Sequence, residues 1–196
     1  MSWFTDLLRS VFGIKPKKKD IKIPNPLPGS ERMQLQSDGS ERAEEAIAAI
    51  KGFVRAPYQI TDRVIRIEVV SFEEGKAYFI KRGNDAKDWD KNHVGHAYAP
   101  MTGFNEGYSL IHLIDTPLSQ EERVRWSLHE FPHLIWHYLL YASEWNAFTS
   151  HNLSAEDFAN DLTRRWLGAK LDKWRTAYFV RLEARLVETG SKSQRH

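Results

Sequence analysis

The chain has 196 residues, of which 41% are hydrophobic and 28% charged, which fits one globular domain with appended sequence and excludes two large domains. It contains no cysteine, which excludes disulfides, thiolate metal sites and a cysteine nucleophile. The formal net charge of +2 is too close to neutral to indicate a nucleic-acid partner. No window approaches the roughly 18 apolar residues needed to cross a bilayer. We therefore expect a cytoplasmic protein without a transmembrane segment.

Residues 1–14 are predicted to form a short amphipathic helix, because large apolar side chains recur there at helical spacing. A basic cluster follows directly, and this combination suits an anionic membrane surface, a virion or an acidic docking partner. The alternative is a helix packed on its own domain, followed by a solvated run of charge. The residues expected to make the contact are Trp3, Phe4, Leu7, Leu8, Lys15, Lys17, Lys18 and Lys19.

The middle of the chain predicts a linker, a helix and a small sheet. Residues 20–40 contain prolines at positions 24, 26 and 28 and are expected to be an extended linker. A helix follows from Ser40 to about Phe53. Alternating apolar residues then predict a β-hairpin, and two more strands complete a small antiparallel sheet. The four predicted strands cover residues 64–72, 76–81, 93–99 and 108–114.

The last third of the chain is predicted to be helical. A capping box at Ser119 begins a long helix that extends to about Tyr141, and a second cap at Ser154 begins another. A final amphipathic stretch covers residues 169–187. We therefore expect an α+β domain over residues 41–190, in which the antiparallel sheet packs against these helices, with a tail at 191–196.

The most informative segment is His129-Glu130-Phe131-Pro132-His133. Two histidines four residues apart on a helix differ by about 40° around the axis and about 6 Å along it, so both imidazoles can bind one metal ion. Glu130 then lies where it can accept a proton from an attacking water. His137 is about 12 Å along the axis from His129, too far to be a third ligand on a straight helix. Glu156 in the next helix is the preferred third ligand, and the other candidates are His151, Asp157 and Asp161.

With these residues in place, the chain resembles the ImmA/IrrE family of small zinc metallopeptidases. The resemblance covers roughly residues 42–168: a strand at 108–115, the His-Glu-x-x-His helix with a further histidine four residues on, and Glu156-Asp157-Phe158-Ala159-Asn160, which is similar to the family's Glu-x-x-Ala-Asn segment. It implies a zinc ion held by His129, His133 and an acidic residue of the Glu156 segment. The chain departs from the family pattern at Pro132, where the missing amide predicts a kink inside the site.

Two functions follow as expectations. The first is a zinc-dependent endopeptidase in which Glu130 activates water against a peptide bond, and the resemblance implies that the substrate is a regulatory protein of a bacterium, phage or mobile element. In that case His137, Tyr138 or Tyr141 is expected to help stabilise the oxyanion. The second is a non-catalytic assembly protein of a phage or mobile element, tethered through its N-terminal helix. DNA binding through the lysines at 15–19 is a weaker third, because no reading element accompanies them.

Overall fold

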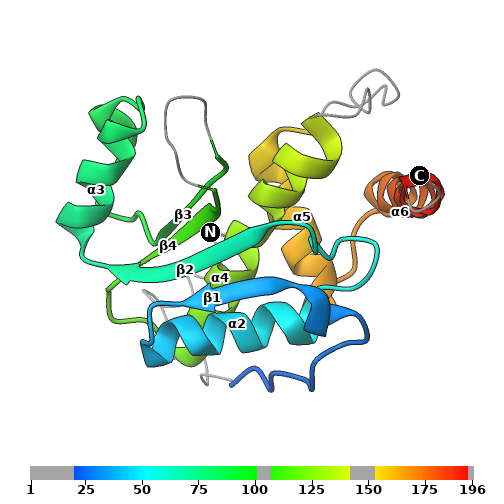
Figure 1. Cartoon of the computed structure of the whole chain (residues 1–196), viewed down its shortest axis with the longest axis horizontal. Helices are drawn as coiled ribbons and strands as arrows, with labels where there is room; N and C mark the ends of the chain where they lie inside the picture. Colours follow the sequence, from blue (N-terminus) through cyan, green and yellow to red (C-terminus); the bar gives the residue numbers. More distant parts are fainter. Residues whose placement is uncertain (1–19, 101–106, 142–152, 194–196) are drawn as a thin grey trace, which may run out of the picture.

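The structure is a computed structural model that describes residues 20–100, 107–141 and 153–193 (Figure 1). It confirms the expected α+β class. In chain order its elements are the 3₁₀ turn η1 (Ser30–Arg32), β1 (Gln34–Ser37), α2 (Glu41–Phe53), β2 (Val64–Val70), α3 (Phe72–Lys81), the 3₁₀ turn η2 (Ala86–Asp88), β3 (Gly95–Tyr98), β4 (Ser109–Ile114), α4 (Gln120–Ile135), the π-helix η3 (Trp136–Tyr141), α5 (Ala155–Trp166) and α6 (Lys173–Ser193). No helix within these ranges combines the length and apolar character needed to cross a bilayer.

The sheet has four strands in the order β1-β2-β4-β3. β1 pairs with β2 and β2 with β4 in parallel, whereas β3 pairs with β4 antiparallel. The prediction of an antiparallel sheet was therefore wrong. The helix α2 connects β1 to β2 and returns the chain, so that β2 runs in the same direction as β1. After α3 the chain enters β3 in the opposite direction, and β4 turns back to run parallel to β2. The antiparallel strand β3 lies at one edge, as Figure 1 shows.

The predicted hairpin over residues 64–81 was also wrong, because its second half is the helix α3 (Phe72–Lys81). Ser71 and Glu74 form a reciprocal capping box at its start, which supplies partners for amides that a helix start leaves unpaired. Phe72 and Phe79 lie seven residues apart, which is two helical turns, and both of their rings contact Trp89. Helical spacing and a cap therefore outweigh the aromatic, strand-like composition of this segment.

Two hydrophobic cores lie on opposite faces of the sheet. The larger contains residues of α2, α4, α5 and α6, and the smaller packs α3 against the other face. β4 contributes to both, since Ile111 and Leu113 belong to the larger core and Leu110 and Ile114 to the smaller. A strand buried on both faces has this alternation. The helix α4 is thereby held against the sheet, with β3 beside it.

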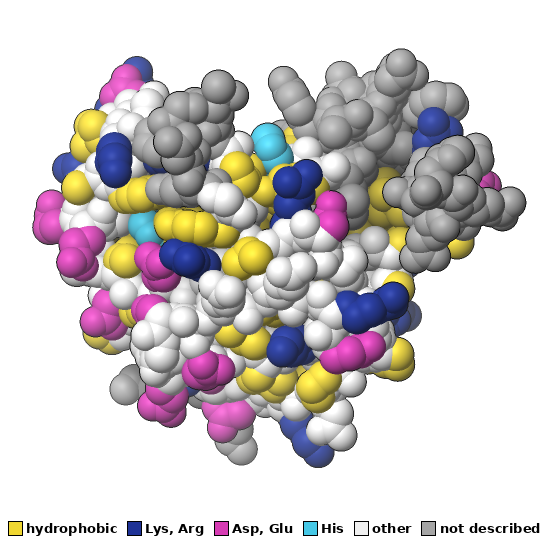
Figure 2. All heavy atoms as spheres, viewed as in Figure 1, with side chains coloured by type: hydrophobic (Ala, Val, Ile, Leu, Met, Phe, Trp, Pro, Cys, Tyr) yellow, Lys and Arg dark blue, Asp and Glu magenta, His cyan; other side chains and the backbone are white. Residues whose placement is uncertain are grey.

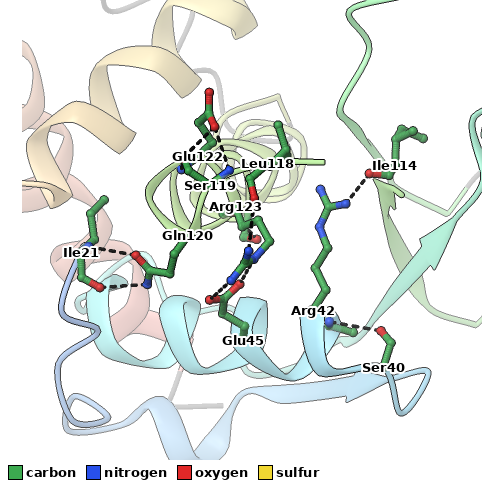
Figure 3. A network of polar contacts seen from close by, with 12 residues as sticks. Ile21, Ser40, Arg42, Glu45, Ile114, Leu118, Ser119, Gln120, Glu122 and Arg123 are labelled. Carbon is green, nitrogen blue, oxygen red and sulfur yellow. Dashed lines mark hydrogen bonds and ion pairs between the residues drawn. The ribbon is translucent and has the colours of Figure 1, made fainter. Parts of the chain in front are cut away.

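Polar contacts join α2 and the preceding extended segment to α4 (Figure 3). The side-chain amide of Gln120 accepts from the Ile21 N–H at 2.9 Å and donates to the Ile21 carbonyl at 3.0 Å. The guanidinium of Arg123 donates to both carboxylate oxygens of Glu45, at 2.6 and 3.0 Å. Residues 20–40 contain the 3₁₀ turn η1 and contribute strand β1 to the sheet of the domain.

Acidic side chains gather at the left of the face drawn in Figure 2, over the first turns of α2 and α3. Glu41 and Glu44 occupy the first turn of α2, and Glu73 and Glu74 that of α3. A negative charge near a helix N-terminus is stabilised by the helix dipole. The stabilisation of the helix N-termini of α2 and α3 therefore accounts for this acidic surface.

Candidate metal centre

The helix α4 carries the His-Glu-x-x-His segment in its last two turns. It begins with a capping box in which Ser119 accepts from the Glu122 amide and the Glu122 carboxylate accepts from the Ser119 amide. The α-helix passes through Pro132 to Ile135 and then widens into the π-helix η3. Widened turns of this kind are frequent at functional sites. His129 and Glu130 are buried here, at 5% and 4% exposure.

The structure brings His129, His133 and Glu156 together. The two imidazole Nε2 atoms are 3.4 Å apart. His129 Nε2 lies 3.2 Å from Glu156 Oε1, and His133 Nε2 lies 3.6 Å from Glu156 Oε2. Three ligand atoms, one from each side chain, converge within 4.8 Å of one another and could hold a metal ion.

The helix α5 presents Glu156 to this site from its first turn. Ser154 caps the helix by accepting from the Asp157 amide at 3.0 Å. Asn160, one turn later, donates from Nδ2 to Glu156 Oε1 at 3.1 Å. The hydrogen bond from His129 is the main cause that lowers the pKa of Glu156. Glu156 is therefore an ionised carboxylate with an orienting partner, as a metal-binding carboxylate requires.

Glu130 lies between α4 and the edge strand β3. Burial raises its pKa to about 7, partly offset by the neighbouring His129, and the amide of Ala97 donates to its carboxylate. A side chain at Gly95 would press on Glu130, because a Cβ there would lie 3.0 Å from both Glu130 Cγ and Oε1, a tight contact from which the Glu130 side chain would have to move. The absence of a side chain at Gly95 therefore makes room for the Glu130 side chain. Two residues further along β3, the Ala97 amide holds the Glu130 carboxylate by a hydrogen bond.

A cavity of about 370 Å³ opens beside His129, His133 and Glu156. Burial lowers the pKa of His133 to about 4 and that of His96 to about 3, so both imidazoles are neutral at pH 7 and their nitrogens can serve as ligands or hydrogen-bond partners. Glu156 leaves this cavity open to solvent, since 64% of its side chain is exposed. The lining residues are Asp90, Asn92, His93, Val94, Gly95, His96, Ala97, Trp126, His129, Glu130, His133 and Glu156.

A larger cavity, of about 560 Å³, lies where residues 55–58 meet α5 and α6. Tyr58, Trp166 and Glu183 are among its lining residues. None of the predicted site residues that the structure describes lines it. The smaller cavity is therefore the candidate site, because it is the one lined by the possible metal ligands His129, His133 and Glu156.

The remaining predicted residues lie elsewhere. His137 is exposed and Tyr138 is bonded through its hydroxyl to Ser109, and neither lines the smaller cavity. Asp157 accepts from Ser154, and Asp161 forms an ion pair with Arg175 at 2.9 Å. The predicted contact residues at positions 3–19, the side chain of Tyr141 and His151 lie outside the described residues.

Sequence reasoning missed the wall of the cavity that residues 90–97 form. Gly95 and Ala97 are two small residues in alternation on a strand, a weak sign that another side chain approaches closely. His93 and His96 carry no recognisable spacing, and only the pairing of β3 with β4 places them beside α4. Trp126 belongs to α4 itself and contacts His129, with ring centroids 5.3 Å apart.

Comparisons of this chain with family models, with curated proteins and with solved structures find no match.

Proposed function

We propose that the protein is a zinc-dependent endopeptidase whose metal ligands are His129, His133 and Glu156. The convergence of these three side chains carries the proposal. A tetrahedral zinc site with bonds of about 2.0–2.2 Å separates its ligand atoms by about 3.3 Å. The two Nε2 atoms are 3.4 Å apart, His129 Nε2 lies 3.2 Å from Glu156 Oε1, and His133 Nε2 lies 3.6 Å from the other carboxylate oxygen, Oε2. One ligand atom from each side chain lies within 4.8 Å of the other two. Two imidazoles and one carboxylate are a donor set that catalytic zinc uses, with a fourth position left for water or substrate.

Glu130 is the proposed general base. Zinc, when bound, lowers the pKa of water and polarises a carbonyl group. The Glu130 carboxylate accepts the proton of the attacking water and then donates it to the leaving amine. A pKa of about 7 suits both steps, because a group that must accept and return a proton works best when its pKa is near the working pH.

The edge strand β3 supports a peptide as the substrate. The Ile114 amide donates to the Val94 carbonyl at 3.0 Å, so residue 94 and every second residue after it exchange hydrogen bonds with β4. The backbone groups of Gly95 and Ala97 therefore point away from β4, beside the cavity, where no other strand of the described residues pairs with β3 and where the Ala97 amide donates to Glu130. An extended peptide can add to such an edge as a further strand. The resemblance to ImmA/IrrE peptidases adds that this peptide belongs to a regulatory protein in the cytoplasm.

Metal analysis of the purified protein tests the proposal first. About one zinc ion per chain is expected for the wild type and none for H133A. H137A is the matched control, because His137 lies one turn further along the same stretch of chain but is exposed and outside the cavity. Zinc in all three proteins, or in none, would contradict the proposed site.

Hydrolysis of a mixture of internally quenched peptides tests the reaction. The wild type is expected to cleave, whereas E130Q is expected to retain zinc and lose cleavage by at least a hundredfold, because a general base contributes about 10²–10⁴-fold. Equal cleavage by E130Q would exclude Glu130 as the base.

A further inference from the structure

Pro132 leaves a carbonyl of α4 without its usual partner. In an α-helix the amide of residue 132 would donate to the carbonyl of Leu128, but proline has no N–H. In this structure the hydroxyl of Thr163 donates to the Leu128 carbonyl at 3.2 Å. Both residues are buried, at 2% exposure for Thr163 and 0% for Leu128. The freed carbonyl is thus satisfied by a side chain from the neighbouring helix α5.

Thr163 and Glu156 lie on the same face of α5. They are seven residues apart, which brings them within about 20° around the helix axis and about 10 Å along it. Between them lie Ala159, which is fully buried, and Asn160, which donates to Glu156. One face of α5 therefore meets α4 twice: through Glu156 at His129 and His133, and two turns later through Thr163 at Leu128.

We propose that Thr163 is a positioning residue for Glu156, and that Pro132 creates the acceptor that Thr163 uses. The inference rests on the proposed metal site and names what holds its third ligand in place. The apolar packing between α5 and α4 has no direction, so it does not by itself prevent the two helices from sliding or rotating against each other. The hydrogen bond from Thr163 fixes the register of α5 against α4, and so the distance of Glu156 from the two imidazoles.

The Thr163 hydroxyl has two effects that can be tested separately: it satisfies the Leu128 carbonyl, and it links α5 to α4. T163V leaves the buried Leu128 carbonyl unpaired, which destabilises the fold, and it also removes the bond between the helices. P132A restores an amide to α4 that can satisfy the carbonyl from within the helix. In the double variant P132A/T163V, stability should therefore recover while the link to α5 stays broken.

The experiment measures the Zn²⁺ dissociation constant, by competition with a fluorescent chelator, and the free energy of unfolding of the metal-free proteins in urea. T163V is expected to bind Zn²⁺ about tenfold more weakly than the wild type, the scale of losing a residue that orients a metal ligand. T163S keeps the hydroxyl and is expected to restore both stability and affinity. P132A/T163V is expected to recover stability but to keep the weak affinity. I67V, a buried change in β2, is the matched control for lost stability with unchanged affinity.

The outcomes distinguish the two proposals. If the wild type binds no Zn²⁺, the proposed function fails. If the wild type and T163V bind with equal affinity, the role of Thr163 is refuted while the metal site stands. If affinity recovers together with stability in P132A/T163V, Thr163 acts only through the stability of the fold, and the positioning role is also refuted.

Discussion

Replacing Glu130 by Gln should stabilise the metal-free protein above neutral pH. The Glu130 carboxyl has a pKa of about 7 in the folded protein, against an ordinary value of 4.5, mainly because it is buried. Below pH 4.5 it is protonated in both states and contributes no difference. Between pH 4.5 and 7 the unfolded chain releases this proton and the folded chain keeps it, so rising pH favours unfolding. The raised pKa thus gives stability that is present at low pH and lost as the pH passes 7.

The magnitude follows from the two pKa values. They differ by about 2.5, and each unit corresponds to 1.36 kcal/mol, so the folded wild type loses about 3 kcal/mol relative to E130Q between pH 4 and pH 8. Urea unfolding of both proteins, treated with a chelator, measures this difference at each pH. Because the difference is taken between two proteins at the same pH, titrating groups that do not interact with Glu130 cancel. An E130Q protein no more stable than the wild type at pH 8 than at pH 4 would refute the reasoning.

Three further predictions test the packing and the metal. G95A should fold and keep its zinc but lose at least tenfold in kcat with little change in KM, because the atoms that the new Cβ displaces belong to the Glu130 side chain and not to the backbone. G107A is the control, because a Cβ there meets no atom of the described residues within 4 Å, and equal kcat for both variants would contradict the packing. G52A places a Cβ 2.7 Å from the Pro24 carbonyl, so it should loosen the 20–28 segment, cost about 1–3 kcal/mol and speed proteolysis there, whereas an unchanged cleavage rate would show that the segment adapts. Zinc at a hundred times its Kd should stabilise the wild type by about 2.7 kcal/mol, read as a higher melting temperature that a chelator reverses; an unchanged melting temperature would argue against a native-state site.

The sequence by itself determined the features that depend on residues within a turn or two of one another. The caps at Ser40, Ser119 and Ser154 placed the starts of α2, α4 and α5, and all three are confirmed. A cap acts through a side chain and an amide three residues later, so it can be recognised without the rest of the fold. The pairing of His129 with His133 is of the same kind, since helix geometry alone brings positions four apart together.

Only the tertiary structure decided what depends on contacts between distant segments. The directions of the strands depend on which strands pair in the sheet, and the sequence patterns of the single strands did not reveal them. Glu156, Asp157 and Asp161 were all acidic candidates on one helix, and the way α5 packs on α4 selected Glu156. Pro132 illustrates the difference, because the sequence showed that a carbonyl would lose its amide, whereas the partner that replaces it, Thr163, lies 35 residues from that carbonyl along the chain. Such partners are chosen by the burial of whole helices against one another, and no local spacing in the sequence records that choice.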